Sequence, residues 1–195
     1  MNEDFTLELS NYAGLTASIV LTINFFLGML LATAYRTNSL WKKLPAKIQR
    51  IDINDIHNYT AYIAWALVGL HVVFLLVDKT SKFTFIDAIF PVNAPTQSLV
   101  VSFGTLSLYA LTIVIITTQK VIKRKVSFRA WKNIHLISYG TAMLFVLHGI
   151  FMDQHLQNLQ PDYFDGEKLL LEICGIALVA ASVWRFKYHL KKTRV

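Results

Sequence analysis

Five long runs of apolar residues, almost free of charge, constrain this chain most. They cover about Tyr12–Tyr35, Ile56–Val77, Ser98–Thr118, Ile134–Met152 and Lys168–Phe186. A helix needs about 20 mainly apolar residues to cross the hydrocarbon core of a bilayer, where backbone polar groups must be satisfied within the helix. Soluble core helices account for one or two such runs but not for five. The sequence therefore predicts an all-α, polytopic membrane helix bundle of five transmembrane helices, a single domain over residues 1–195.

The basic residues indicate how this bundle is oriented. Sixteen of the 19 Lys and Arg residues flank one set of span ends: Arg36, Lys42, Lys43, Lys47, Arg50, Lys120, Lys123, Arg124, Lys125, Arg129, Lys132, Arg185, Lys187, Lys191, Lys192 and Arg194. Most of the acidic residues lie on the other side. Because cytoplasmic loops carry the excess of Lys and Arg, we expect the N-terminus outside and the C-terminus in the cytoplasm. The net charge of +7 therefore reflects membrane topology and does not indicate a nucleic-acid partner. We expect the membrane to be a cell membrane, namely a bacterial inner membrane.

Four of the six histidines lie within two of the spans. His57 and His71 are in the second span, and His135 and His148 are in the fourth. At about 1.5 Å per residue, the two steps cover about 21 and 20 Å, so His57 is level with His135 and His71 is level with His148. Ionisable residues within a span mark function by default, and two histidines facing each other at one depth suit the two axial positions of a b-type haem. The four histidines are therefore the candidate haem-iron ligands.

Helix periodicity leaves part of this arrangement open. At about 100° per residue, His57 and His71 share a face, whereas His135 and His148 are offset by about 140°. A local irregularity at Gly140 would correct the offset. Structural or proton-relaying histidines remain an alternative, and a bare metal ion is disfavoured because the histidines lie at two levels. His155 could join His148 in an outer metal site but is expected in a solvated loop, and His189 is expected at the surface.

The segments around the histidines resemble the ferric reductase-like transmembrane domain. The resemblance rests on Ile56-His57-Asn58, Gly69-Leu70-His71, Trp131-Lys132-Asn133-Ile134-His135-Leu136 and Leu147-His148-Gly149, and covers about Ile51 to Phe186. This domain is the haem-bearing core of NADPH oxidases, of ferric reductases and of the bacterial haem subunit that partners a periplasmic methionine sulfoxide reductase. The resemblance implies two stacked b haems, an inner one on His57 and His135 and an outer one on His71 and His148. It also implies an electron path from cytoplasm to exterior.

The sequence carries no Gly-rich nucleotide fingerprint, so a redox function needs an external source of electrons. We expect a cytoplasmic flavoprotein reductase or a quinol as donor, with flavin or quinone supplied by that partner. The expected acceptor is external: ferric iron, oxygen, a flavin or a partner protein. Two alternatives remain, namely a cytochrome b subunit that exchanges electrons with the quinone pool and a non-enzymatic haem-binding membrane protein.

Several other side chains have expected roles around these haems. Trp65, Tyr139 and Phe145 lie in sequence between the two histidine levels and are candidates to bridge them. The basic residues Arg36, Lys132 and Arg185 are candidate partners for haem propionates at the cytoplasmic end. We expect the apolar segment Phe83–Phe90 to lie on the membrane surface.

Overall fold

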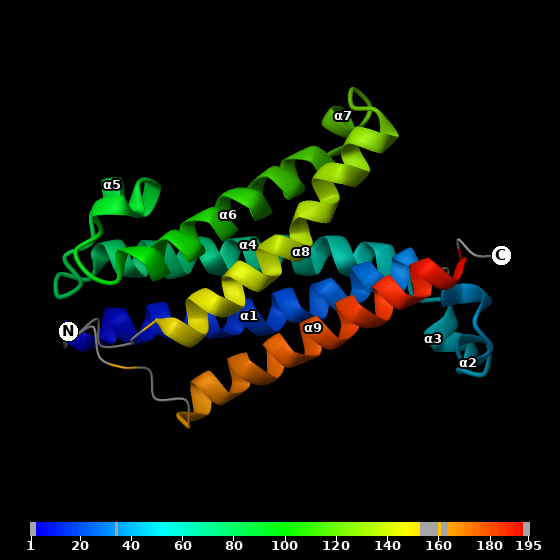
Figure 1. Cartoon of the computed structure of the whole chain (residues 1–195), viewed down its shortest axis with the longest axis horizontal. Helices are drawn as coiled ribbons and strands as arrows, with labels where there is room; N and C mark the ends of the chain where they lie inside the picture. Colours follow the sequence, from blue (N-terminus) through cyan, green and yellow to red (C-terminus); the bar gives the residue numbers. More distant parts are fainter. Residues whose placement is uncertain (1–2, 34, 153–159, 161–163, 193–195) are drawn as a thin grey trace.

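The computed structural model describes residues 3–33, 35–152, 160 and 164–192. These residues form helices joined by turns, and five of the helices are long and apolar enough to cross a membrane (Figure 1). They are α1 (Glu3–Ala32), α4 (Ile53–Val77), α6 (Ser98–Thr118), α8 (Phe128–Phe151) and α9 (Gly166–Lys192). The prediction of an all-helical, multi-pass membrane bundle is confirmed.

Some of these helices extend well beyond the apolar runs. The bounds of α6 coincide with the predicted run, whereas α1 and α8 begin well before Tyr12 and Ile134. Hydropathy detects only the part of a helix that lies in the hydrocarbon, while capping decides where the helix starts. At α8 the cap is Ser127, whose side chain accepts a hydrogen bond from the backbone N–H of Ala130.

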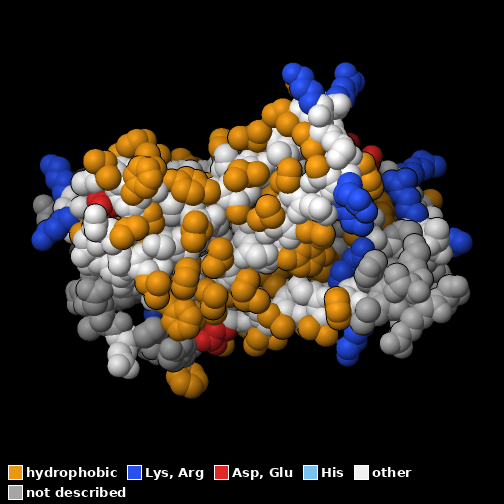
Figure 2. Space-filling view, turned by 45° about the horizontal axis from the view of Figure 1, so that its top comes forward, with side chains coloured by type: hydrophobic (Ala, Val, Ile, Leu, Met, Phe, Trp, Pro, Cys, Tyr) orange, Lys and Arg blue, Asp and Glu red, His pale blue; other side chains and the backbone are white. Residues whose placement is uncertain are grey.

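Short helices fill the connections at the two ends of the bundle. At one end lie η1 (Tyr35–Thr37), α2 (Ser39–Lys42), α3 (Ala46–Gln49) and α7 (Lys120–Lys123), and at the other lie α5 (Phe85–Ile89) and η2 (Pro91–Asn93). We call the first the basic end, because most of the Lys and Arg side chains visible in Figure 2 gather there. Hydrophobic side chains cover the middle of the molecule in the same view, as a lipid-facing surface requires.

The five long helices are arranged as two closely packed pairs with a fifth helix alongside. α1 packs along α4, α6 packs along α8, and α9 lies against α8 and α1 (Figure 1). The pairs meet in a small core of Ala17, Val68 and Phe145. The histidine-bearing helices α4 and α8 are not among the closely packed neighbours within the described residues. They therefore face each other across the middle of the bundle with space between them.

A buried carboxylate fixes the start of α1 against the end of α4. Asp78, 3% exposed, accepts hydrogen bonds from the Thr6 hydroxyl (2.6 Å), the Thr80 hydroxyl (2.5 Å) and the Ser81 backbone N–H (2.8 Å). Burial opposes the ionisation of Asp78, but the hydrogen bonds from Thr6 and Thr80 outweigh it and lower its pKa. This contact holds the first turns of α1 at a fixed height beside α4.

The segment expected at the membrane surface forms α5 and its flanks. A capping box closes the start of α5, where Thr84 and Asp87 exchange side-chain and backbone hydrogen bonds, and these bonds from Thr84 lower the pKa of Asp87. Phe85, Ile86 and Phe90 are each 69% exposed, whereas Phe83 is buried. Most of the segment thus presents apolar side chains outward, and its place on a membrane surface stays a prediction.

Candidate functional site

The structure brings the four histidines of α4 and α8 into two pairs. The ring centres of His57 and His135 lie 6.1 Å apart with an interplanar angle of 73°, and those of His71 and His148 lie 6.3 Å apart with an angle of 78°. The first pair lies toward the basic end, and the second pair lies toward the opposite end. Each level of the bundle therefore holds one histidine from each of the two facing helices.

The pairing is reached without any break in α8. This helix is continuous from Phe128 to Phe151, so the irregularity that the 13-residue spacing suggested at Gly140 is not present. Figure 1 shows α8 running obliquely to α4. The inclination turns different faces of α8 toward α4 at its two ends, which accommodates the rotational offset of His135 and His148.

Three of the four imidazoles are held through Nδ1 by a backbone carbonyl of a neighbouring helix. The acceptors are the carbonyl oxygens of Asn24 for His57 (3.1 Å), Ser10 for His71 (2.8 Å) and Val100 for His148 (2.8 Å). Because a carbonyl oxygen can only accept, the proton sits on Nδ1 and Nε2 is left as the free lone pair. This is the tautomer in which histidine ligates a metal through Nε2. In the described residues, no hydrogen bond engages Nε2 of these histidines.

A glycine follows each accepting carbonyl by four residues. The three are Gly28 after Asn24, Gly14 after Ser10 and Gly104 after Val100. A Cβ added there would lie 3.1 Å from His57, 3.1 Å from His71 and 2.8 Å from His148. In an α-helix the carbonyl of residue i points toward residue i+4, so a side chain at that position would crowd the approach of the imidazole. Glycine leaves the carbonyl open.

Sequence reasoning missed these supporting residues, although a signal for them exists. Gly14 and Gly28 are 14 residues apart, as are Ser10 and Asn24, and this equals the spacing of His57 and His71. Two neighbouring antiparallel helices with the same internal spacing can make the same contact twice. The repeat in the first span therefore indicated α1 as the partner of α4.

His135 is held differently from the other three histidines. Its Nδ1 is buried with no hydrogen-bond partner in the described part of the chain. Trp131, one helical turn earlier, stacks on the imidazole with ring centres 5.3 Å apart and an interplanar angle of 20°. Lys123 Nζ lies 4.2 Å from the centre of the Trp131 ring. Stacking therefore supports the His135 ring where a hydrogen bond supports the others.

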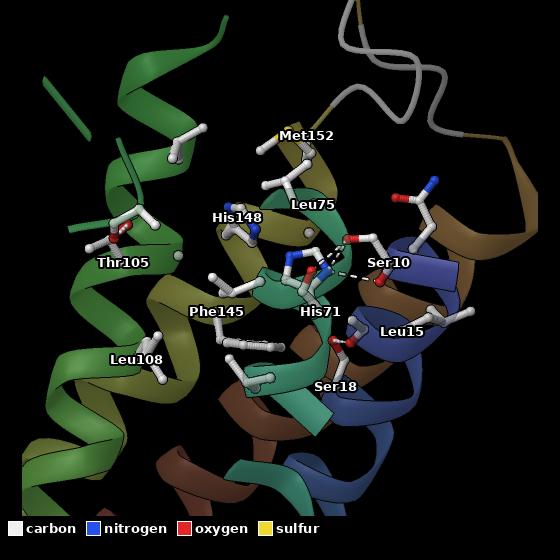
Figure 3. Close-up of a pocket in the computed structure, with 18 of the residues that line it drawn as sticks. Ser10, Leu15, Ser18, His71, Leu75, Thr105, Leu108, Phe145, His148 and Met152 are labelled. Atoms are coloured by element: carbon white, nitrogen blue, oxygen red, sulfur yellow. Dashed lines mark hydrogen bonds between the residues drawn. The ribbon is translucent and has the colours of Figure 1, made fainter. Parts of the chain in front are cut away.

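A cavity of about 140 Å³ surrounds the second pair. In Figure 3 the rings of His71 and His148 lie in its middle, with Phe145 on one side and Leu75 and Met152 on the other. One water molecule needs about 10–15 Å³, so the cavity is far larger than a hydration site. Its lining is mostly apolar, which suits an apolar ligand that offers a metal to the two imidazoles.

The geometry of both pairs fits haem iron. Two imidazoles on opposite sides of one metal have ring centres about 6 Å apart, given a metal–nitrogen bond of about 2 Å and about 1 Å from nitrogen to ring centre. The observed separations of 6.1 and 6.3 Å agree with this value. Within the described residues, no group of three or more His, Cys, Asp or Glu side chains is placed to hold a bare metal ion. The residues present therefore fit a flat group ligated from two sides.

The three aromatic residues expected between the levels lie in different surroundings. Phe145 is buried in the core and lines the cavity. Tyr139 packs edge-on against Phe25, with ring centres 4.8 Å apart. Trp65 is 44% exposed and donates its indole N–H to Thr112. Phe145 is thus the one of these three placed at the wall of the cavity.

The remaining expected residues are spread over the molecule. Arg36 and Lys132 are exposed near the basic end, where Arg36 donates a hydrogen bond to Tyr35, and Arg185 is half-buried on α9. Cys174 is a buried free thiol. His155 and the side chain of His189 lie outside the described residues.

Comparison with known proteins places the chain in a family. Residues 13–147 match the family described as ferric reductase like transmembrane component. This stretch includes His57, His71 and His135 and ends one residue before His148. No curated protein and no solved structure matches the chain. Because the match covers well over half of its length, the chain belongs to the ferric reductase-like transmembrane family.

Proposed function

We propose that this protein binds two b-type haems, one between the histidines of each pair, and carries electrons across the membrane. The observation that supports this proposal is the presence of two facing imidazole pairs at two depths of a transmembrane bundle. Three of these imidazoles have Nδ1 bonded to a carbonyl and Nε2 free. Membership of the ferric reductase-like family agrees with this function.

The protein's own residues supply binding and orientation. A bound haem would accept and release one electron at a time, at a potential set by its ligands and its burial. The carbonyls of Asn24, Ser10 and Val100 fix the tautomer and direction of three ligating rings. The Ser10 hydroxyl adds a contact to His71 Nδ1 at 3.0 Å and donates to the His71 carbonyl at 2.9 Å. Rings held in this way stay in place when the charge at the site changes.

The expected direction of transfer is outward. If the basic end faces the cytoplasm, the His57–His135 pair receives the electron and the His71–His148 pair delivers it. A membrane potential that is negative inside favours this movement by about 2.3 kcal/mol per charge per 100 mV. The Lys and Arg side chains of the basic end suit an acidic cytoplasmic flavoprotein as donor, since complementary charge steers association. The acceptor would be ferric iron, oxygen, a flavin or a partner protein outside a bacterial inner membrane.

Haem stoichiometry in histidine variants tests the proposal. We expect the purified protein to show a b-type reduced-minus-oxidised spectrum and about two haems per chain by pyridine haemochrome, one for each bis-histidine site. His57→Ala and His71→Ala should each lower this number to one or none. His189→Ala, a histidine outside both pairs, is the matched control and should leave it unchanged.

Three outcomes would count against parts of the proposal. Absence of haem, or full haem content in both His57→Ala and His71→Ala, would contradict haem binding by these pairs. One haem per chain in the wild type would remove the two-level electron path. Reduction by quinol but not by a flavoprotein would identify the quinone pool as the donor.

A further inference from the structure

Lys168 is a buried lysine at the edge of the cavity around His71 and His148. It lies in the first turn of α9, is 6% exposed and lines the cavity. Its ammonium makes no hydrogen bond or ion pair with the described residues. Lys168 thus brings a positive charge to a cavity whose other walls are mostly apolar.

A buried ammonium is costly unless an anion faces it. Charged side chains within membrane spans pair with one another or with a ligand, because the low-dielectric surroundings do not solvate them. Glu167 also lines the cavity and has an interaction of its own. The start of α9 adds backbone N–H groups that lack helical acceptors, and these also favour negative charge. The cavity therefore suits a ligand with an apolar body and an anionic edge.

We propose that Lys168 binds a carboxylate of the ligand held between His71 and His148, namely a propionate of its porphyrin. This inference rests on the proposed function and adds the orientation of the ligand, whose carboxylate edge faces the start of α9. Lys168 would bind a propionate at this end of the bundle, as Arg36, Lys132 and Arg185 are expected to do at the basic end. A soluble substrate with a carboxylate could bind Lys168 through the same group. Binding of porphyrins and of citrate distinguishes these two ligands.

Iron-free porphyrins test the assignment without relying on ligation by histidine. The full chain is expressed under haem limitation, and the binding of protoporphyrin IX and of its dimethyl ester is followed by fluorescence. We expect the wild type to bind protoporphyrin IX about tenfold more tightly than the ester, because esterification removes a charge-assisted hydrogen bond. Lys168→Met and Lys168→Gln should lower this preference, and Lys168→Arg should keep it. Lys79→Met, which removes an exposed lysine at the same end, is the matched control and should also keep it.

The proposal is overturned if the wild type shows no preference for the free carboxylates or if the preference is as large in both Lys168→Met and Lys168→Gln as in the wild type. Citrate binding that depends on Lys168, with an unchanged porphyrin preference, would assign the lysine to a soluble carboxylate and also overturn it. Loss of haem iron binding, read separately by pyridine haemochrome, would count against the proposed function and not against the carboxylate site.

Discussion

The four paired histidines differ in what holds their rings in place. His57, His71 and His148 each reach a backbone carbonyl, whereas His135 lies under Trp131 with its Nδ1 unpaired in the described structure. Partners of ligating histidines orient the ring and raise its basicity, and their loss typically costs about 10- to 100-fold in metal affinity. The site at the basic end therefore depends on an aromatic contact where the other site depends on hydrogen bonds.

Substitution of Trp131 should weaken ligand binding at the His57–His135 site selectively. Trp131→Leu removes the stacking surface, and we expect haem to dissociate about tenfold faster from this site. Trp131→Phe keeps a flat ring and should stay close to the wild type. The dissociation rate can be measured in a His71→Ala background, where the second site is disabled.

Trp184→Leu is the control for this experiment, because Trp184 is an exposed tryptophan on α9, a helix that carries none of the paired histidines. Equal losses in Trp131→Leu and Trp131→Phe would show that the stack does not support His135. An unchanged rate in Trp131→Leu would lead to the same conclusion.

At the scale of residues, the sequence predicted the depth of each histidine in the bundle. It did not predict the backbone carbonyls and the tryptophan that hold the imidazole rings. The spacing of 14 and 13 residues is enough to place His57 with His135 and His71 with His148. The acceptors are backbone carbonyls, which every residue carries, so side-chain identity at Ser10, Asn24 or Val100 gives no direct signal. Only the glycines four residues later mark these positions in the sequence.

Two helices that carry none of the paired histidines shape both sites. α1 supplies Gly14 and Gly28, and α6 supplies Gly104, each against a histidine of the adjacent helix. The close packing of α1 on α4 and of α6 on α8 brings these glycines into contact with the rings. Helix–helix contact, and not the histidine-bearing helices alone, therefore sets the direction of the imidazoles.

Gly104→Ala should disturb the site of His148. A Cβ at this position would lie 2.8, 2.9 and 3.0 Å from three atoms of the imidazole ring, so the ring must move away from the Val100 carbonyl. We expect the haem content to fall from about two to about one per chain, because a partner of the ligating ring is lost. Haem content is read by pyridine haemochrome, and thermal stability is measured on the same samples.

Gly140→Ala provides the matched control within α8. A Cβ at Gly140 would meet no atom within 4 Å in the described structure, and alanine is favoured over glycine in a helix by about 1 kcal/mol. This variant should keep its haem and lose no stability. Full haem content and an unchanged Tm in Gly104→Ala would show that the helices can separate enough to accept the methyl group.

Helix packing could not be derived from the sequence in the same way as the spans. In a soluble protein, an apolar stripe on one face shows where a helix packs. Here both the lipid-facing and the buried faces are apolar, and close packing instead uses small residues such as Ala17 and Ala64, each 0% exposed. Hydropathy therefore predicted five helices but not the pairs that they form.

For the molecule as a whole, the distribution of charge predicts its orientation. Because Lys and Arg gather at one end, we expect that end to face the cytoplasm. Green fluorescent protein fused after Val195 should fluoresce, and alkaline phosphatase fused there should be inactive. Fusions in the connection between α4 and α6 should give the reverse result. Active alkaline phosphatase and non-fluorescent green fluorescent protein after Val195 would place the basic end outside and reverse the proposed electron path.

The division of the bundle into two pairs also bears on how the protein is made. Each pair is a hairpin of two successive membrane-spanning helices, α1 with α4 and α6 with α8. Each hairpin can therefore associate in the bilayer during synthesis, before α9 is complete. A ligand that binds one histidine of each hairpin joins the two hairpins and stabilises the assembled bundle by mass action. In a cell short of that ligand, the hairpins would remain apart more often and be open to membrane proteases. The steady-state amount of this protein would then follow the supply of the proposed haem, independently of the rate at which its gene is expressed.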